Sequence, residues 1–316
     1  MNTQPLSIMT WNIYFGASFA PLFTSPPEEI PARVTDVFRQ FLATDLPTRA
    51  KAIARIICNT SPDIIGLQEA AKWTLTIPHS TIIEYGFIKI LLRELEKLGM
   101  YYRIVAQNKN SSNSLLSSNN TIISFEDRDF ILARECSNLC IFNSQSANFT
   151  TNSIVQIGGQ PFTVKQGWSY IDAKFQKFQF RLVNTHLDAL SPTVRLIQLN
   201  ELLATPGDTT LPLFFIGDFN SNSTTNDILY QNLLSNGFQD AFGIAGRGNG
   251  FTCCQNSDLL NASSTLNTRI DWITFKNANN LTVNCAYVVG DTQQERTCTG
   301  LWPSDHASVV AHFEIH

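Results

Sequence analysis

Hydrophobic residues along this 316-residue chain follow two patterns: short continuous or alternating runs, and runs spaced at three- and four-residue intervals. The first pattern predicts strands at residues 7–11, 64–67, 130–133, 169–175, 178–185, 213–216, 269–275, 282–289 and 307–315. The second pattern predicts helices at residues 47–58, 86–98, 191–204 and 225–234. Strands followed by helices in both halves of the chain indicate an α/β protein whose sheets are covered by helices.

No internal repeat and no linker divides the sequence, so residues 1–316 are expected to form a single domain. The Asn- and Ser-rich stretch at residues 108–120 has strand-like segments on both sides and is interpreted as a surface loop. Residues 1–7 lead almost directly into the first strand, so no signal peptide is expected in this chain. No apolar stretch approaches the roughly 20 residues that a membrane helix needs.

Composition adds a large core and a weakly charged surface to this picture. Hydrophobic residues make up 43% of the chain and charged residues only 15%, so the 22 Phe residues are expected in the core. The formal net charge is −4, and no run of basic residues offers a track for a polyanion. This argues only weakly against nucleic acid, because carboxylates at a metal site would account for part of the negative balance.

Seven cysteines are present, and none has the paired spacing with histidine that a structural zinc site needs. Cys136 and Cys140 could close a short loop, and Cys253 or Cys254 could reach residues 285–298. The adjacent Cys253 and Cys254 could also bond to each other, but packed thiols are the simpler interpretation. Few charges, many Asn, Ser and Thr residues and seven cysteines favour an exported protein over a cytoplasmic one, and a monomer is expected.

Polar residues that can bind a metal or transfer a proton follow the predicted strands. Five apolar segments each end at such residues, namely Asn12, Glu69, His186, the pair Asp218 and Asn220, and the pair Asp305 and His306. A sixth, Asp271, falls inside the predicted strand 269–275. Taken singly, an Asp or Asn after a strand is usually a turn former or helix cap. The whole set indicates a site, because a rigid sheet brings the loops at its strand ends together.

Six short motifs occur in a fixed order, and their sequences are TWNIY (10–14), LQE (67–69), NTHLD (184–188), GDFN (217–220), RIDWI (269–273) and SDH (304–306). Together they resemble the endonuclease/exonuclease/phosphatase superfamily, the DNase I-like fold, over almost the whole chain. The resemblance implies a four-layer α/β/β/α sandwich in which two mixed sheets pack face to face with helices outside.

The resemblance also implies a role for each matched residue. The implied ligands of Mg²⁺ or Mn²⁺ are Asn12, Glu69 and Asp305. The implied catalytic residues are His186, Asp218, Asn220, Asp271 and His306. In this scheme Asp271 orients His306 against the phosphate, Asp218 and Asn220 position or deprotonate the attacking water, and His186 contacts the phosphate or assists the leaving group. Such residues suit a phosphoester, whose negative charge repels a nucleophile until a metal and histidine donors neutralise it.

The sequence therefore predicts a metal-dependent phosphoester hydrolase, and the presence of both His186 and His306 favours a phosphodiesterase acting on nucleic acid or a phospholipid headgroup. An inositol- or lipid-phosphate phosphatase and a non-catalytic interaction module with the same fold stay open as alternatives. Arg195 could touch a phosphate, although a solvated surface position is the simpler interpretation. Substrate choice is expected to depend on the loops between the motifs, at residues 15–46, 73–86, 108–128 and 243–268.

Overall fold

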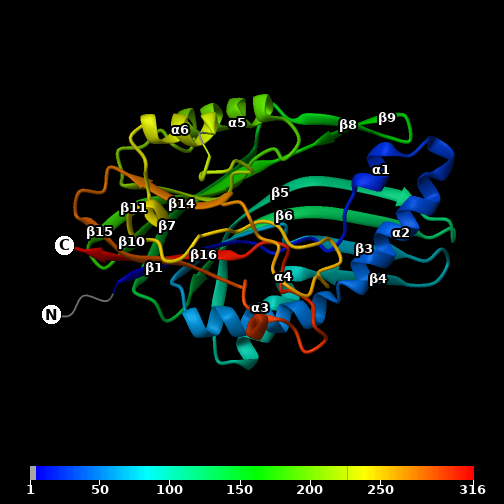
Figure 1. Cartoon of the computed structure of the whole chain (residues 1–316), viewed down its shortest axis with the longest axis horizontal. Helices are drawn as coiled ribbons and strands as arrows, with labels where there is room; N and C mark the ends of the chain where they lie inside the picture. The colour runs from blue at the N-terminus through cyan, green and yellow to red at the C-terminus, as the bar shows by residue number, and fades with distance from the viewer. Residues whose placement is uncertain (1–4, 226) are drawn as a thin grey trace.

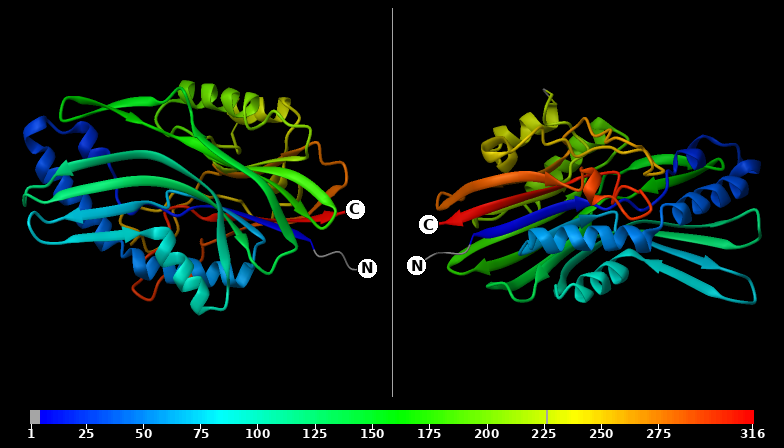
Figure 2. Two further views of the ribbon diagram at one scale, coloured as in Figure 1. Left: turned by 180° about the vertical axis from the view of Figure 1, so that it is seen from behind. Right: turned by 60° about the horizontal axis from the view of Figure 1, so that its bottom comes forward.

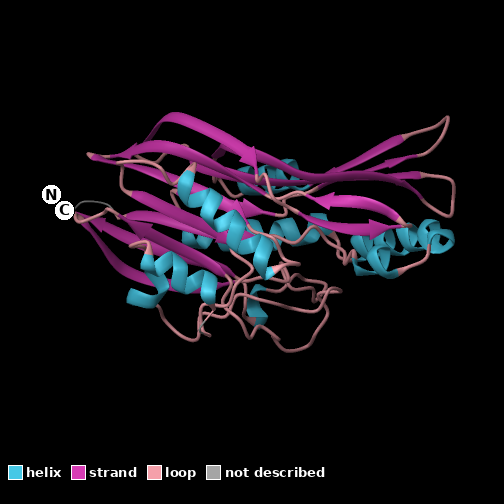
Figure 3. Cartoon of the chain, turned by 90° about the horizontal axis from the view of Figure 1, so that it is seen from above, coloured by secondary structure: helices cyan, strands magenta, loops and turns pink. Residues whose placement is uncertain are grey.

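The apolar runs of the sequence assemble into two mixed β-sheets that pack face to face, with helices on the outer face of each sheet (Figure 1). The structure is a computed structural model, and it describes residues 5–225 and 227–316. Figure 3 shows that the strands follow the long axis of the molecule. The expected layered α/β sandwich is confirmed.

The first sheet has the strand order β15-β16-β1-β2-β6-β3-β4, and β5 also pairs with β6. Its strands are β1 (Leu6–Asn12), β2 (Ile64–Gln68), β3 (Lys72–Thr76), β4 (Ile82–Gly86), β5 (Tyr102–Leu116), β6 (Ile122–Arg134), β15 (Leu281–Val289) and β16 (Ser308–Ile315). The β1–β2 pair is parallel and its other pairs are antiparallel.

The second sheet has the order β13-β14-β12-β11-β10-β7, in which only the β11–β12 pair is parallel. Its strands are β7 (Leu139–Asn148), β10 (Gly167–Phe175), β11 (Phe178–His186), β12 (Leu213–Asp218), β13 (Gln239–Asp240) and β14 (Asp271–Lys276). A separate two-stranded hairpin is formed by β8 (Ser153–Ile157) and β9 (Gln160–Val164).

The helices are α1 (Ala20–Thr24), α2 (Ile30–Ala43), α3 (Leu46–Thr60), α4 (Phe87–Lys97), α5 (Pro192–Ala204), α6 (Ile228–Ser235) and α7 (Ala241–Ala245), with 3-10 turns η1 (Pro27–Glu29) and η2 (Gln293–Glu295). Asp227 caps α6 through its carboxylate, which accepts a hydrogen bond from Leu229 N at 2.9 Å. The helix predicted at 225–234 therefore begins three residues later, and Asn226 lies outside the described residues, as do residues 1–4 of the segment judged for a signal peptide. Within the described part of the chain, no helix combines the length and hydrophobicity of a membrane span.

Three layers of apolar contact hold the sandwich together. Strands of both sheets contribute to the layer between them, which includes Ile8, Ile64, Ile131, Leu182, Phe214 and Ile216. A second layer packs α2, α3 and α4 onto the outer face of the first sheet, and a third packs α5 and α6 onto the second sheet. Because one strand face points inward and the other outward, each central strand is buried on both sides, which explains its continuous apolar run.

A fully buried polar link fixes the two sheets relative to each other. Asn184 on β11 donates hydrogen bonds to Leu67 O at 3.1 Å and Phe130 O at 3.2 Å, and it accepts one from Gln68 Nε2 at 2.7 Å. Gly66 makes room for this link, since a Cβ atom there would lie 2.6 Å from Asn184 Oδ1. The ends of β2 and β11 are thereby held in one register.

Three segments expected to be loops are folded. Residues 108–116 lie in β5 and residues 117–120 form the turn before β6, because a long antiparallel ladder between these strands satisfies the backbone where the side chains favour turns. Residues 15–46 contain α1 and α2, and residues 73–86 contain β3 and β4. The loop prediction was wrong for these segments. In contrast, most of residues 243–268 has no regular structure.

Candidate active site

The second sheet aligns three of the predicted site residues on neighbouring strands. His186 ends β11, Asp218 ends β12 and Asp271 begins β14, and the pairing registers place His186 opposite Asp218 and Asp218 opposite Asp271. The sequence pattern had placed Asp271 inside its strand. The structure instead makes it the first residue of β14. The distance from His186 Nε2 to Asp218 Oδ2 is 3.6 Å.

Asn12, the last residue of β1, connects the first sheet to this row. Its amide nitrogen donates to Glu69 Oε1 at 3.0 Å and to Asp218 Oδ2 at 3.1 Å, and its oxygen accepts from Tyr14 N at 3.1 Å. The second carboxylate oxygen of Glu69 accepts from Phe15 N at 3.1 Å. In this arrangement Asn12 positions two carboxylates, and the predicted role as a metal ligand would require its side chain to turn.

The segment that leads into β16 contributes Asp305 and His306. Ser304 Oγ donates to Asn12 O at 2.7 Å, which fixes this segment against the end of β1. His306 Nδ1 donates to Asp271 Oδ2 at 2.9 Å and lies 3.9 Å from Asp218 Oδ2. This bond orients the imidazole and leaves Nε2 as the atom that can face a substrate.

Asn220 and Arg195 shape the loop after β12. Asn220 has a left-handed φ of +50° and donates from its side chain to Leu187 O at 2.9 Å. The guanidinium of Arg195 donates to the backbone oxygens of Asn220 and Asp188, the latter at 2.8 Å. The interpretation of Arg195 as a solvated surface residue was wrong, because the two loops give it carbonyl partners that surface water would otherwise supply.

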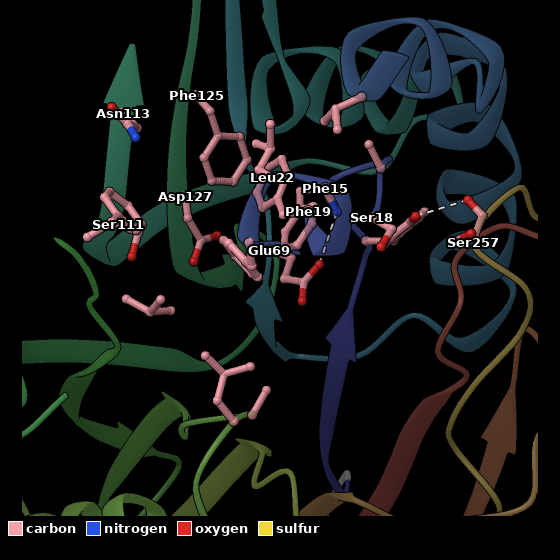
Figure 4. Close-up of a pocket in the computed structure, with 18 of the residues that line it drawn as sticks. Phe15, Ser18, Phe19, Leu22, Glu69, Ser111, Asn113, Phe125, Asp127 and Ser257 are labelled. Carbon is pink, nitrogen blue, oxygen red and sulfur yellow. Dashed lines mark hydrogen bonds between the residues drawn. The ribbon is translucent and has the colours of Figure 1, made fainter. Parts of the chain in front are cut away.

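All eight predicted residues converge on one pocket with a volume of about 390 Å³. Those that line it are Glu69, His186, Asp218, Asn220, Asp305 and His306. Asn12 and Asp271 lie directly behind them, in contact with Glu69 and His306 respectively. Figure 4 shows Glu69 at the centre of the pocket, with the bond from Phe15 drawn as a dashed line. The catalytic and ligand roles of these residues stay predictions.

The electrostatics of the pocket are dominated by buried carboxylates. Burial, reinforced by the charge of Asp305, raises the pKa of Glu69 to about 8. Burial also raises the pKa of Asp271 to about 6. Burial opposes the charged form of His306, but the charge and hydrogen bond of Asp271 outweigh it and raise the His306 pKa well above the ordinary value. At neutral pH the geometry therefore favours an imidazolium at His306.

A divalent cation fits this donor set. None of the described residues that line the pocket is Lys or Arg, so among the lining side chains only the imidazoles of His186 and His306 can carry positive charge beside the carboxylates. Carboxylate oxygens are the ligands that Mg²⁺ and Mn²⁺ prefer. The raised pKa of Glu69 reflects a site where negative charge is costly until a cation compensates it. Glu69 and Asp305 are the best placed to hold the ion, because both are partly open to the pocket.

Two buried acids of the site were missed by the sequence analysis. Asp127 lines the pocket, and Asp129 accepts from Glu69 N at 3.3 Å. Asn110 donates to both, at 3.2 Å to Asp127 and 2.8 Å to Asp129. The available signal was the alternation in β6, where Glu126 lies on the opposite face of the strand from these two acids. Assigning this region to a loop hid that signal.

The vicinal cysteines lie beside the site. Cys253 and Cys254 form a disulfide with each other. The backbone of Cys253 also forms isolated antiparallel β-bridges with the backbones of Thr268 and His306. The interpretation of Cys253 and Cys254 as packed thiols was wrong, because the two side chains are bonded to each other within the 243–268 segment. The other proposed pairings do not form either, since the remaining thiols are free: Cys58, Cys136, Cys140, Cys285 and Cys298.

A buried arginine supports the loops that carry the site. Arg49 on α3 is fully buried, and its guanidinium donates to the carbonyls of Ile13 at 2.9 Å, Tyr14 at 3.0 Å, Thr44 at 2.8 Å and Pro303 at 3.1 Å. Burial lowers the pKa of Arg49 to about 10, so it stays charged at neutral pH. It therefore ties the chain after β1 to the segment before Asp305 and His306.

We expect Arg49→Met to lower the free energy of unfolding by about 3 kcal/mol, because four buried carbonyls lose a charged donor. Urea unfolding followed by circular dichroism measures the loss. Arg55→Met is the matched control on the same helix, since Arg55 is exposed and makes a single bond of 3.3 Å to Arg296 O. Equal midpoints for the two variants would contradict this role for Arg49.

Two mixed sheets that bring polar strand ends into one pocket are the arrangement of the DNase I-like fold. Comparisons with known proteins support this assignment. A sequence profile described as the Endonuclease/Exonuclease/phosphatase family matches residues 9–306. The chain belongs to this family. The comparison with curated proteins finds no significant sequence match.

Solved structures share the fold at low sequence identity. A family protein from Bacteroides thetaiotaomicron has 17% identity and a TM-score of 0.61, covering 99% of this chain and 100% of that one. A mannosyl-6-phosphatase from B. thetaiotaomicron VPI-5482 has 16% identity and a TM-score of 0.61, covering 98% and 100%. TDP2 from D. rerio, solved with a single-strand DNA product, has 16% identity and a TM-score of 0.60, covering 99% and 100%.

Proposed function

We propose that this chain is a divalent-metal-dependent phosphoester hydrolase that acts as a single domain and cleaves diesters in preference to monoesters. The observation that carries the proposal is the pair of imidazoles around one carboxylate. His186 Nε2 and His306 Nδ1 lie 3.6 Å and 3.9 Å from Asp218 Oδ2, in the pocket that Glu69 also lines. Family membership supports the reaction class.

Each residue has a task that follows from its contacts. Glu69 and Asp305 would hold Mg²⁺ or Mn²⁺, which when bound neutralises charge on the phosphate. Asp218 accepts a proton from the attacking water, and Asn220 keeps the loop beside it in place. Asp271 holds His306 charged and oriented.

The two imidazoles then act on the ester. His306 donates a hydrogen bond to a phosphate oxygen from Nε2, and its partner Asp271 keeps that atom directed into the pocket. Burial lowers the pKa of His186, but the negative charges of Asp218 and Asp129 outweigh burial and raise it above the ordinary value. His186 can therefore give a proton to the leaving oxygen. Both donors work where charge develops during the displacement.

The preference for diesters follows from the charge of the pocket. A monoester is a dianion near neutral pH, whereas a diester carries one negative charge. With four acidic residues and no described Lys or Arg in the lining, the pocket favours the less charged ester: the acids are Glu69, Asp127, Asp218 and Asp305. The phosphatase alternative requires the pocket to compensate one more negative charge, and His186 and His306 are the only described lining side chains that can supply positive charge.

Release of p-nitrophenol tests the proposal. With Mg²⁺ or Mn²⁺ present, we expect kcat/KM for bis(p-nitrophenyl) phosphate to exceed that for p-nitrophenyl phosphate by about tenfold, roughly 1.4 kcal/mol in the barrier. Samples with EDTA serve as the blank. Preference for the monoester would favour the phosphatase alternative. Metal binding without turnover of either ester would favour a non-catalytic interaction module and overturn the proposal.

A further inference from the structure

The pocket continues beyond the carboxylates into an extension lined by apolar side chains. We call this extension the apolar arm and define it by Phe15, Phe19, Leu22, Phe125, Ile157 and Phe162. Several of these side chains are only half-buried, so their faces are open to the pocket and not consumed by the core. The expectation that the Phe residues belong to the core holds only in part for this group, because its four Phe side chains pack against the core but are half-buried.

The arm begins directly at the candidate metal site. Phe15 donates its backbone N–H to Glu69 Oε2, and its ring stacks on Phe19 with centroids 4.9 Å apart. Phe125 meets both rings edge-on, at 5.4 Å from Phe15 and 4.7 Å from Phe19. Figure 4 shows these rings and Leu22 gathered beside Glu69. A group esterified to a phosphate at Glu69 therefore meets this wall without leaving the pocket.

The β8–β9 hairpin forms the opposite wall. Along it, Val155, Ile157 and Phe162 pack toward the pocket side, while Ile154 faces solvent and is 65% exposed. The hairpin turn rests on the start of α2, where a Cβ atom on Gly158 would lie 3.1 Å from Ile30. Figure 2 shows the hairpin and the long strands β5 and β6 reaching toward α1 and α2. These contacts place the hairpin beside the arm and seat its turn against α2.

Size and charge restrict what the arm can hold. The whole pocket measures about 390 Å³, within the roughly 300–1,000 Å³ of small-molecule sites. The same volume must also hold the phosphate and the second ester group, so the part left for the arm suits one alkyl chain better than two. A nucleobase on an aromatic platform is usually accompanied by a groove of Lys and Arg residues that follows the phosphates, and the described lining includes no Lys or Arg.

We propose that the apolar arm binds the hydrocarbon chain of a single-chain phosphodiester amphiphile while the phosphate lies at Glu69. The inference rests on the proposed function, because it takes the catalytic end of the pocket as the place of the phosphate. It narrows the substrate to an ester with one long alkyl group and a small, weakly charged second group.

A series of alkyl p-nitrophenyl phosphates tests the arm. Water adds to phosphorus, the bond to p-nitrophenolate breaks, and the alkyl phosphate is the second product. We expect kcat/KM to rise at least about 100-fold from the methyl to the octyl ester, less than the roughly fourfold per methylene of complete burial. Concentrations below the micelle limit exclude a surface effect, and thymidine 5′-p-nitrophenyl phosphate represents a nucleic-acid substrate.

The outcomes separate the two proposals. Turnover that is independent of chain length, or fastest with the thymidine ester, overturns the apolar arm and leaves the hydrolase intact. Failure to cleave any ester with metal present overturns the hydrolase itself. Binding then tests the arm without turnover: in EDTA, we expect dodecylphosphocholine below its micelle limit to bind with a negative heat-capacity change, and glycerophosphocholine not to bind. Equal binding of both would refute the arm.

A pair of hairpin variants locates the effect. Phe162→Asp is expected to reduce the octyl-to-methyl ratio of kcat/KM by at least about tenfold, because a charge faces the chain. Ile154→Asp introduces the same charge on the solvent face of the same hairpin and should keep the ratio. Turnover of the methyl ester by each preparation reports that its site is folded. A ratio that falls equally in both variants would overturn the location of the arm.

Discussion

His306→Asn is expected to lower kcat for a phosphodiester by about a thousandfold while changing the free energy of unfolding by less than about 1 kcal/mol. Asparagine removes Nε2, the atom proposed to face the phosphate. Its amide nitrogen can still donate to Asp271 Oδ2, as His306 Nδ1 does at 2.9 Å. Initial rates at saturating ester and metal, with urea unfolding in parallel, measure the two quantities.

The asparagine variant matters because alanine confounds two effects. Asp271 is fully buried, and its Oδ1 has no hydrogen-bond partner among the described residues. His306→Ala would leave the remaining oxygen unpaired as well, at a cost on the order of 3 kcal/mol. Loss of activity in that variant alone could therefore reflect a disturbed fold.

Two further variants decide whether His306 acts as part of a unit. Asp271→Asn should lower kcat less than His306→Asn does. The double variant should have a kcat little lower than that of His306→Asn alone, because Asp271 acts only through His306. His312→Asn is the matched control, since His312 lies on β16 away from the pocket and bonds to Tyr287. A near-normal rate for His306→Asn, or strict additivity in the double variant, would contradict the assignment.

The positions of the site residues could be predicted because strand periodicity and strand ends are local signals. The strands before Asn12 and Asp218 are buried on both faces, and the strand before His186 alternates before it becomes fully buried, so the end of each apolar pattern is visible in the sequence. The structure extends those strands by a residue or two, so each of the three is the last residue of its strand. To predict that these residues lie in one pocket, the order of the six motifs along the chain was needed as well.

The walls of the pocket could not be predicted for a different reason. Residues 108–120 are rich in Asn and Ser, which favour turns, and most of them form a strand because β6, the next strand along the chain, pairs with them in a long antiparallel hairpin. Arg49 gave no local sign of its role, since its four carbonyl partners come from three separate segments. Tertiary contacts such as those of Arg49 leave no local signal in the sequence.

The pocket has two parts, which come from different elements of the fold. The strand ends supply the carboxylates and imidazoles of the pocket, while α1, α2, β5, β6 and the β8–β9 hairpin supply the wall beside them. Glu69 lies at the boundary, because one carboxylate oxygen bonds to Asn12 and the other to Phe15. Chemistry and substrate choice therefore meet at this residue, which makes it the most informative position for a metal test.

Glu69→Gln is expected to weaken metal binding by about 100-fold and to lower kcat/KM at fixed Mg²⁺ by a similar factor, because an anionic ligand becomes neutral. The shape of the side chain is preserved. Activity and melting temperature as functions of metal concentration measure the effect. At 100 times its Kd the metal should stabilise the native chain by roughly 2.7 kcal/mol, and the variant at the same concentration by only about 0.4 kcal/mol.

The metal-free variant separates charge from shape. Burial and Asp305 raise the Glu69 pKa to about 8, so the ionised carboxylate is costly without a cation, and the neutral amide should remove that cost. One hydrogen bond from Asn12 or Phe15 is lost in exchange, which leaves the metal-free variant no less stable than the native chain. Glu84→Gln is the control, since Glu84 is 49% exposed and pairs with Lys72 at the surface. If metal stabilises Glu69→Gln and the native chain equally, Glu69 is not a ligand, and the ion must be held by the other carboxylates of the pocket.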